Sequence, residues 1–210
     1  TDGIVDLASW SIQYLSGEAT STAAIKKKNF EAGHAIDPRG FFLVARGLSG
    51  AGGDGYGGAR PADMSHHSFS LSGEARGASV FLVATTTPIA DVADALVADS
   101  LSYGNVLTPG LTTTTVPAAG ESIERLAWSS DRCTSAQGSG EFLGHGCDRG
   151  ENASDFEVRS TPNPQNRSSL PEPRPGPTPT RFRAAFSSNT LTVELTWDVA
   201  ADAAGATSTV

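Results

Sequence analysis

The chain has 210 residues and a formal net charge of −8, with 38% hydrophobic and only 18% charged residues. Its longest basic run is the three lysines at residues 26–28, which argues against a nucleic-acid partner because phosphate binding needs a larger basic footprint. No stretch approaches the roughly 20 apolar residues of a membrane helix, so no membrane span is predicted. The 23 glycines and 12 prolines favour an all-β chain of short strands and turns.

The first predicted strand follows the start of the chain and shows a period of two. Trp10, Ile12 and Tyr14 fall on one face, and Ser11 and Gln13 fall on the other. This alternation predicts a half-buried strand whose apolar face packs into the core.

Further strand-like segments follow at residues 41–45, 80–84, 99–103 and 122–128. The first two are continuous apolar runs rich in β-branched and aromatic residues, typical of strands covered on both faces. The glycine-rich residues 47–63 have too little apolar surface to offset their ordering entropy, which predicts a long flexible loop. Residues 89–97 are the one place where a short helix competes with the strand pattern.

The large aromatic residues fit a sandwich core better than a carbohydrate platform. They are Trp10, Tyr14, Phe41, Phe42, Phe81 and Trp128.

Two cysteines, Cys133 and Cys147, flank a glycine- and serine-rich stretch. Their even number and spacing predict one disulfide that closes a surface loop, stabilises the fold by about 3 kcal/mol and implies an oxidising compartment. The alternative is a zinc site in which both thiols join His145. Only three ligands are available for it, and the C-x-x-C spacing is absent.

A second candidate site follows the second cysteine, where four oxygen-bearing residues lie within eight positions: Asp148, Glu151, Asn152 and Asp155. Hard oxygen ligands at this spacing could hold Ca²⁺, although the EF-hand pattern is absent. The alternative is a solvated turn in which Asx side chains bond to the local backbone. No other cofactor is predicted.

No catalytic constellation is recognisable in the sequence. The four histidines are scattered, and the adjacent His66 and His67 would point to opposite faces of a strand. Glu121 and Glu124 are three apart on a predicted strand, so they would also face opposite sides. We therefore predict that the chain is not an enzyme.

The proline-rich residues 170–180 predict an extended linker between two domains, residues 1–169 and residues 181–210. After the linker, Leu191, Val193, Leu195 and Trp197 alternate with polar residues, which predicts a further strand. The segment "SSNTLTVELTWDVAADAAGATSTV" resembles the opening of a fibronectin type III domain and predicts a partial second β-sandwich.

A second resemblance covers residues 3–169. "VDLASWSIQY", "FEAGHAIDPRGFFLVARG", "SIERLAWSSDRC" and "HGCDRGENASDFEVRSTPNPQNRSS" are similar, in this order, to motifs of bacterial lamin tail domains. The resemblance implies an immunoglobulin-like β-sandwich. Its core motif would be formed by Asp6, Leu7, Trp10, Phe41, Leu43 and Phe156. The strand that precedes this motif in the family is missing here. The sequence starts without an initiator Met or a signal-peptide pattern, and its last residues cut into a strand-like pattern. We therefore expect an excised piece of a longer protein, with a mature segment as the alternative.

These observations together favour a bacterial protein that is secreted or displayed at the cell surface. The expected role is a non-catalytic structural or adhesion module that binds a protein or surface ligand of unknown identity. The alternative is a binding or targeting appendage of a larger secreted hydrolase, such as a nuclease. A metal-dependent enzyme within the chain is a third hypothesis.

Overall fold

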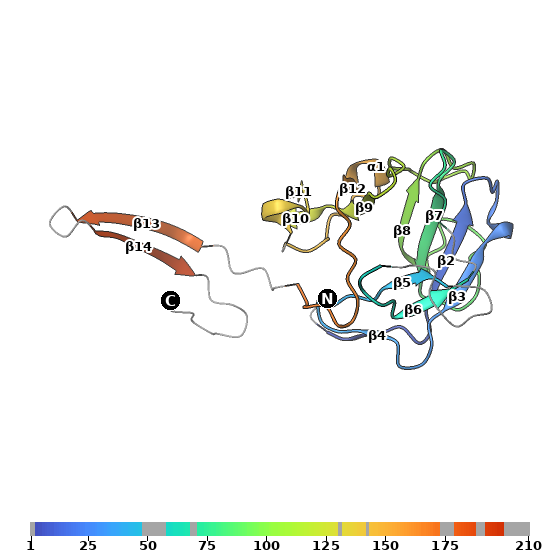
Figure 1. Cartoon of the computed structure of the whole chain (residues 1–210), viewed down its shortest axis with the longest axis horizontal. Helices are drawn as coiled ribbons and strands as arrows, with labels where there is room; N and C mark the ends of the chain where they lie inside the picture. Colours follow the sequence, from blue (N-terminus) through green and yellow to red (C-terminus); the bar gives the residue numbers. More distant parts are fainter. Residues whose placement is uncertain are drawn as a thin grey trace. The chain divides into compact units, whose positions relative to one another are not determined.

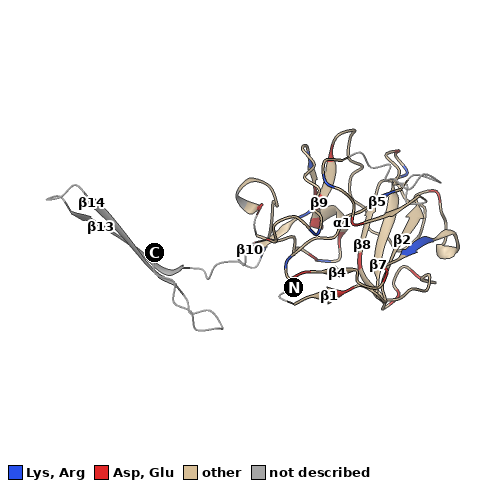
Figure 2. Ribbon diagram, turned by 60° about the horizontal axis from the view of Figure 1, so that its bottom comes forward, with Lys and Arg blue, Asp and Glu red and all other residues tan. Residues whose placement is uncertain are grey.

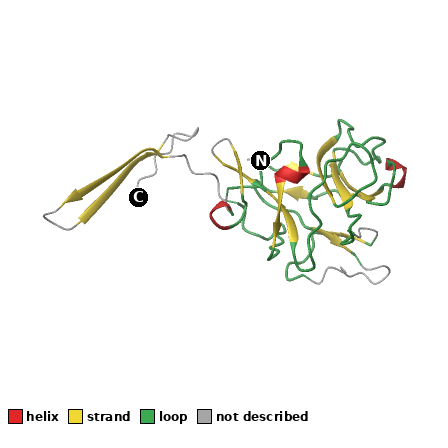
Figure 3. Cartoon of the chain, turned by 90° about the horizontal axis from the view of Figure 1, so that it is seen from above, coloured by secondary structure: helices red, strands yellow, loops and turns green. Residues whose placement is uncertain are grey.

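The computed structural model describes residues 3–47, 58–67, 71–129, 132–141, 143–172, 179–187 and 192–199. The chain divides into two compact units, Thr1–Pro173 and Arg174–Val210, with the boundary inside the proline-rich run. Strands account for most of the regular structure, and the described helices are single short turns (Figures 1 and 3). The predicted all-β class is therefore confirmed.

A four-stranded antiparallel sheet forms the centre of the first unit (Figure 1). In sheet order its strands are β3 (Lys26–Asn29), β2 (Ser11–Ser16), β7 (Ala78–Val83) and β8 (Val97–Tyr103). The register places Gln13 of β2 opposite Phe81 of β7. The continuous apolar run predicted at residues 80–84 thus becomes an inner strand, flanked on both sides by other strands.

Smaller strand pairs surround this sheet. They are β1 (Val5–Asp6) with β4 (Ala35–Ile36), β5 (Val44–Arg46) with β6 (Met64–His66), β9 (Ser122–Arg125) with β12 (Phe156–Arg159), and β10 (Ala127–Ser129) with β11 (Arg132–Thr134). All are antiparallel except the parallel pair β5 and β6. Short helical turns occur at η1 (Thr22–Ala24), η2 (Gly138–Gly140) and α1 (Asn152–Asp155). Figure 2 shows acidic and basic residues interspersed along this unit.

Apolar clusters cover both faces of the central sheet. One face carries Leu15, Phe81, Val83 and Ile89. The other carries two clusters, of which the first is Tyr14, Ala78 and Tyr103 and the second is Leu7, Phe30 and Met64. Ile12 packs against both of these clusters, so they form one continuous core layer.

The prediction that β2 is half-buried is wrong, because Ser11 and Gln13 are fully buried. Their face is covered by residues 85–89, whose backbone supplies hydrogen-bond partners. Gln13 donates from Nε2 to the Thr87 carbonyl (2.8 Å) and accepts at Oε1 from the Ile89 N–H (3.0 Å), while Ser11 Oγ donates to the Thr85 carbonyl (2.6 Å). Buried polar residues whose hydrogen bonds are satisfied in this way produce an alternation of polar and apolar residues, although the polar residues do not face solvent.

The core motif expected from the lamin-tail resemblance is only partly buried. Leu7 is in the core, and Trp10 packs against the same cluster. Asp6 is exposed, where its Oδ1 accepts a hydrogen bond from the Ala8 N–H (2.9 Å), so it serves a turn and not the core. Phe156 is half-buried beneath the Arg125 guanidinium, which lies 4.3 Å from the ring centroid.

Two other local predictions need correction, and one open alternative is decided. Residues 41–45 form a strand only from Val44, and Phe41 and Leu43 are half-buried before it. Residues 89–97 contain turns and no helix, because Asp91 and Asp94 accept hydrogen bonds from backbone N–H groups two residues later. Trp128 is 46% exposed and lies outside the core.

Most of the glycine-rich segment, residues 48–57, falls outside the described residues.

The second unit is described as a single antiparallel hairpin of β13 (Pro179–Ser187) and β14 (Thr192–Val199). The alternating pattern predicted this second strand. Pro179 and Thr180, assigned to the linker from the sequence, belong to β13. Among the described residues, no helix is long and apolar enough to cross a membrane.

Candidate functional site

Charged side chains of the first unit gather at a cavity of about 490 Å³ beside the β9–β12 ribbon. We name this the charged cavity and define it by Glu124, Glu141, His145, Arg159 and Glu172, which all line it. The ribbon places Glu124 directly opposite Glu157, two residues before Arg159. Because cross-strand partners and residues two apart share a face, Glu124 and Arg159 project to the same side.

Arg159 joins two of the carboxylates. Its Nη1 donates to both oxygens of Glu124 (2.9 Å each), and its Nη2 donates to Glu141 Oε1 (3.0 Å). Nε donates to the Thr161 carbonyl (3.0 Å). Hydrogen bonds to Glu124, opposed by burial and reinforced by Glu141, raise the pKa of Arg159. Charge-assisted hydrogen bonds from one guanidinium to two carboxylates fix the three side chains in one geometry.

His145 lies between two carboxylates from distant parts of the sequence. Its Nε2 is 3.0 Å from Glu124 Oε1, and its Nδ1 is 2.8 Å from Glu172 Oε1. The contact at Nδ1 is not aligned as a hydrogen bond, because Glu172 Oε1 is buried and has no hydrogen-bond partner among the described residues. The imidazole is therefore enclosed by two carboxylates and hydrogen-bonds with that of Glu124.

The backbone around residues 163–172, here named the closing segment, holds Glu172 in place. Asn166 is buried, and its Nδ2 donates to the Pro61 carbonyl (2.9 Å). The Arg167 N–H donates to Asp63 Oδ2 (3.1 Å), and the Glu172 N–H donates to the Arg39 carbonyl (3.1 Å). These bonds tie the closing segment to residues more than 100 positions earlier in the chain.

The acid and base groups of the charged cavity bond to one another. Glu124 accepts from Arg159 with both oxygens, and His145 faces a carboxylate at each nitrogen. The hydroxyl of Ser169, which also lines the cavity, is within 3.3 Å of Asn166 Oδ1 and accepts from the Asn166 N–H (3.0 Å). This arrangement favours a rigid, polar wall over a nucleophile activated by a base.

Sequence reasoning missed the charged cavity. It treated Glu124 as one of a pair with Glu121, whose carboxylate instead accepts the Ala118 N–H (2.8 Å). The true partner, Arg159, lies 35 residues away, and no local pattern links the two. The local pattern indicated only that Glu124 belongs to a predicted strand.

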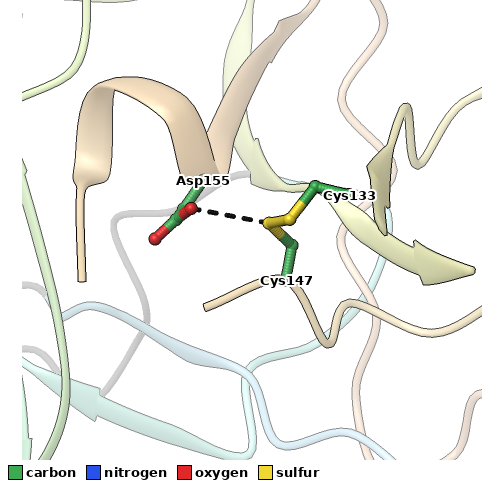
Figure 4. A group of neighbouring side chains, drawn as sticks. All are labelled: Cys133, Cys147 and Asp155. Carbon is green, nitrogen blue, oxygen red and sulfur yellow. Dashed lines mark hydrogen bonds between the residues drawn. A yellow bond between two sulfur atoms is a disulfide. The ribbon is translucent and has the colours of Figure 1, made fainter. Parts of the chain in front are cut away.

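The predicted cysteine pair is present as a disulfide between Cys133 and Cys147, with a Cα–Cα distance of 5.3 Å. Cys147 is completely buried, and its Sγ lies 3.5 Å from Asp155 Oδ1 (Figure 4). Bonded sulfurs are not thiolate ligands, and His145 is engaged by Glu124 and Glu172, so the zinc alternative finds no support here. A disulfide of this kind indicates an oxidising environment.

Asp155 serves the local backbone. Its carboxylate accepts from the Arg149 N–H (2.8 Å), the Arg149 Nε (2.9 Å) and the Glu151 N–H (3.1 Å). Burial alone would raise the pKa of Asp155, but these hydrogen bonds and the Arg149 charge together hold it below its usual value. The carboxylate is thus a structural anchor for the turn before α1.

Two other predicted calcium ligands, Asp148 and Asn152, form hydrogen bonds with the protein backbone. Asp148 is exposed and accepts the Gly150 N–H (3.2 Å), and buried Asn152 donates from Nδ2 to the Thr112 carbonyl (2.8 Å). Among the described residues, the only three His, Cys, Asp or Glu side chains with ligand atoms in mutual reach are Cys133, Cys147 and Asp155. Two of these share the disulfide. The loop therefore resembles the alternative prediction of an Asx-bonded turn.

Comparison of the chain with protein-family models, with curated proteins and with solved structures finds no match. The lamin-tail resemblance therefore rests on the sequence motifs alone. What the molecule can do is inferred from the geometry of its own residues.

Proposed function

We propose that the chain is a non-catalytic extracellular module that binds a protein or surface ligand, with its first unit folded as an immunoglobulin-like sandwich of the lamin-tail type. The observation that carries the proposal is the Cys133–Cys147 disulfide, whose second cysteine is completely buried. Disulfides of this kind form and persist in secreted and surface proteins.

The charged cavity supports a binding role over turnover. General acid and base catalysts need a proton that can move between the side chain and the substrate. Glu124 is held by two hydrogen bonds from Arg159, and His145 is held between two carboxylates. Groups fixed in this way favour recognition of a ligand by a preformed surface.

The two-sided core supports the sandwich part of the proposal. The central sheet has apolar clusters on both faces, and residues on both sides of β2 are buried. In an immunoglobulin-like sandwich, a second sheet covers one of these faces. Ile123 of the β9–β12 ribbon packs against the cluster of Tyr14 and Tyr103, which supports the assignment of this ribbon to such a layer.

The compartment can be tested in the cells that produce the protein. A membrane-impermeant maleimide is added to intact cells, with and without prior reduction, and the protein is then isolated and analysed by mass spectrometry. We expect labelling of Cys133 and Cys147 only after reduction, together with cleavage of the protein by externally added protease. Labelling without reduction, or protection from protease, would contradict an extracellular location.

The binding role needs a separate measurement. The fluorescently labelled full chain is added to the same cells, and bound fluorescence is followed over a range of concentrations. We expect saturable binding that an excess of unlabelled chain displaces. A labelled β-sheet protein of similar size and charge is the control, and binding no stronger than this control would overturn the proposed role.

A further inference from the structure

The charged cavity carries charges of both signs. Three carboxylates line it, from Glu124, Glu141 and Glu172, together with the guanidinium groups of Arg60 and Arg159. Because Arg159 pairs with both Glu124 and Glu141, the wall presents no block of charge of one sign to attract an ionic ligand.

The same cavity offers polar groups that are not committed to other residues. Asn163 and Gln165 line it, and neither side chain makes a hydrogen bond to any other residue that the structure describes. Each amide presents both donors and acceptors. Glu141 adds acceptor capacity, since only its Oε1 is bonded to Arg159.

Carbon surface lies beside these amides. Leu170, which is 87% exposed, and Pro171 line the cavity at the closing segment. A sugar ring presents C–H groups on its faces and hydroxyls around its edge. Apolar side chains next to paired donors and acceptors match both features of such a ring.

We propose that the charged cavity binds a neutral, polyhydroxylated ligand of the oligosaccharide class. Its volume of about 490 Å³ falls within the usual range of small-molecule sites. Hydroxyl groups can accept from Asn163 and Gln165 and donate to Glu141, while the ion pairs behind them keep the wall rigid. This inference rests on the proposed binding function and names the class of ligand.

The test is isothermal titration calorimetry of the full chain with defined probes. The neutral probes are cellohexaose, xylohexaose, mannohexaose and chitohexaose, and the charged probes are hexalysine and hexagalacturonate. We expect saturable binding of at least one neutral hexasaccharide and none of either charged probe. Binding of a charged probe alone, or of no probe, would overturn the proposal.

Variants locate the binding to the cavity. Asn163→Ala and Gln165→Ala should each weaken the affinity for the bound hexasaccharide about threefold to tenfold, as expected for loss of one or two hydrogen bonds. Asn105→Ala removes an exposed amide that does not line this cavity, and it should leave the affinity unchanged. Equal effects of all three variants, or no effect of the first two, would place the ligand elsewhere and overturn the assignment.

The two proposals fail in different ways. If the labelled chain binds cells but no hexasaccharide binds or competes, the oligosaccharide class is wrong and the module still has a ligand. If cell binding is also absent, the binding function itself is overturned.

Discussion

At the scale of single residues, Gln13 shows how a polar side chain can belong to a core. Its amide lies between the face of the central sheet and the backbone of residues 85–89. It bonds there to Ser11 Oγ, the Thr87 carbonyl and the Ile89 N–H. Ser11 and Ile89 are buried, so the amide satisfies the Ile89 N–H, which would otherwise be buried without a hydrogen bond.

Replacing Gln13 by alanine should therefore be costly. The variant leaves the buried Ile89 N–H unsatisfied and opens a cavity, and we expect a loss of about 2 to 4 kcal/mol in the free energy of unfolding. Urea unfolding followed by tryptophan fluorescence measures this loss. Asn105→Ala, at an exposed amide, is the control and should change stability by less than about 0.5 kcal/mol. A similar effect of both variants would contradict the role assigned to Gln13.

Asp155 provides a residue-scale prediction that depends on pH. Its pKa is lowered in the folded state, so its charged form stabilises the fold above the unfolded-state pKa of about 4, and this contribution is lost as the pH falls through the folded-state value. Asp155→Asn should destabilise the protein by about 1 to 3 kcal/mol at pH 7. The difference from the unmodified protein should shrink below about pH 4. Unfolding curves at several pH values would show this, and a difference independent of pH would argue against it.

At the scale of elements, the β9–β12 ribbon and the closing segment are joined chiefly through side chains. His145 bridges Glu124 of β9 and Glu172 of the closing segment. The closing segment is also attached through the backbone bond from Glu172 to Arg39, the Arg167 N–H bond to Asp63 and the bond from Asn166 to Pro61. The bridge should therefore affect local order more than global stability.

Glu172→Ala tests this expectation. We expect faster amide hydrogen exchange in residues 163–172, with exchange in β2 and β7 unchanged. Glu151→Ala is the matched control, because its carboxylate is exposed and bonds to no other described residue. Uniformly faster exchange across the central sheet would instead assign Glu172 a role in global stability.

The disulfide joins β11 to the segment that precedes Asp148. Replacing both Cys133 and Cys147 by alanine should lower the free energy of unfolding by about 3 kcal/mol in the chain-entropy model. Thermal unfolding at neutral pH measures this, with Asn105→Ala at an exposed amide as the control. A chain that fails to fold without the disulfide would show a larger role than loop closure.

Local patterns could predict the strands but not the partners of their side chains. The apolar run at residues 80–84 identified β7, and the alternation at residues 191–197 identified β14. Both were recognisable because the spacing of apolar residues and the content of β-branched residues directly indicate the buried faces of a strand. Ser11 and Gln13 were misassigned, since a hydrogen-bonded core position has the same polarity as a surface position. The pairing of Glu124 with Arg159 depends on strand register, which no local pattern encodes.

At the scale of the whole molecule, the two units differ in how they can be stabilised. The first has core layers on both sides of its sheet, and every residue of the charged cavity precedes Pro173. The described strands of the second form only a two-stranded hairpin. Isolated hairpins of this kind are at best marginally stable in water.

A chain ending at Pro173 should consequently unfold at the same urea midpoint as the full chain, with the transition followed by the fluorescence of Trp10 and Trp128. The reason is that the contacts that stabilise the first unit lie within that unit. It should also keep the affinity for any hexasaccharide bound by the full chain, since the lining residues are retained. Residues 174–210 alone should show no cooperative unfolding transition in circular dichroism. A lower midpoint for the shortened chain would mean that the second unit stabilises the first, whereas unchanged stability with lost affinity would mean that it contributes to the ligand site.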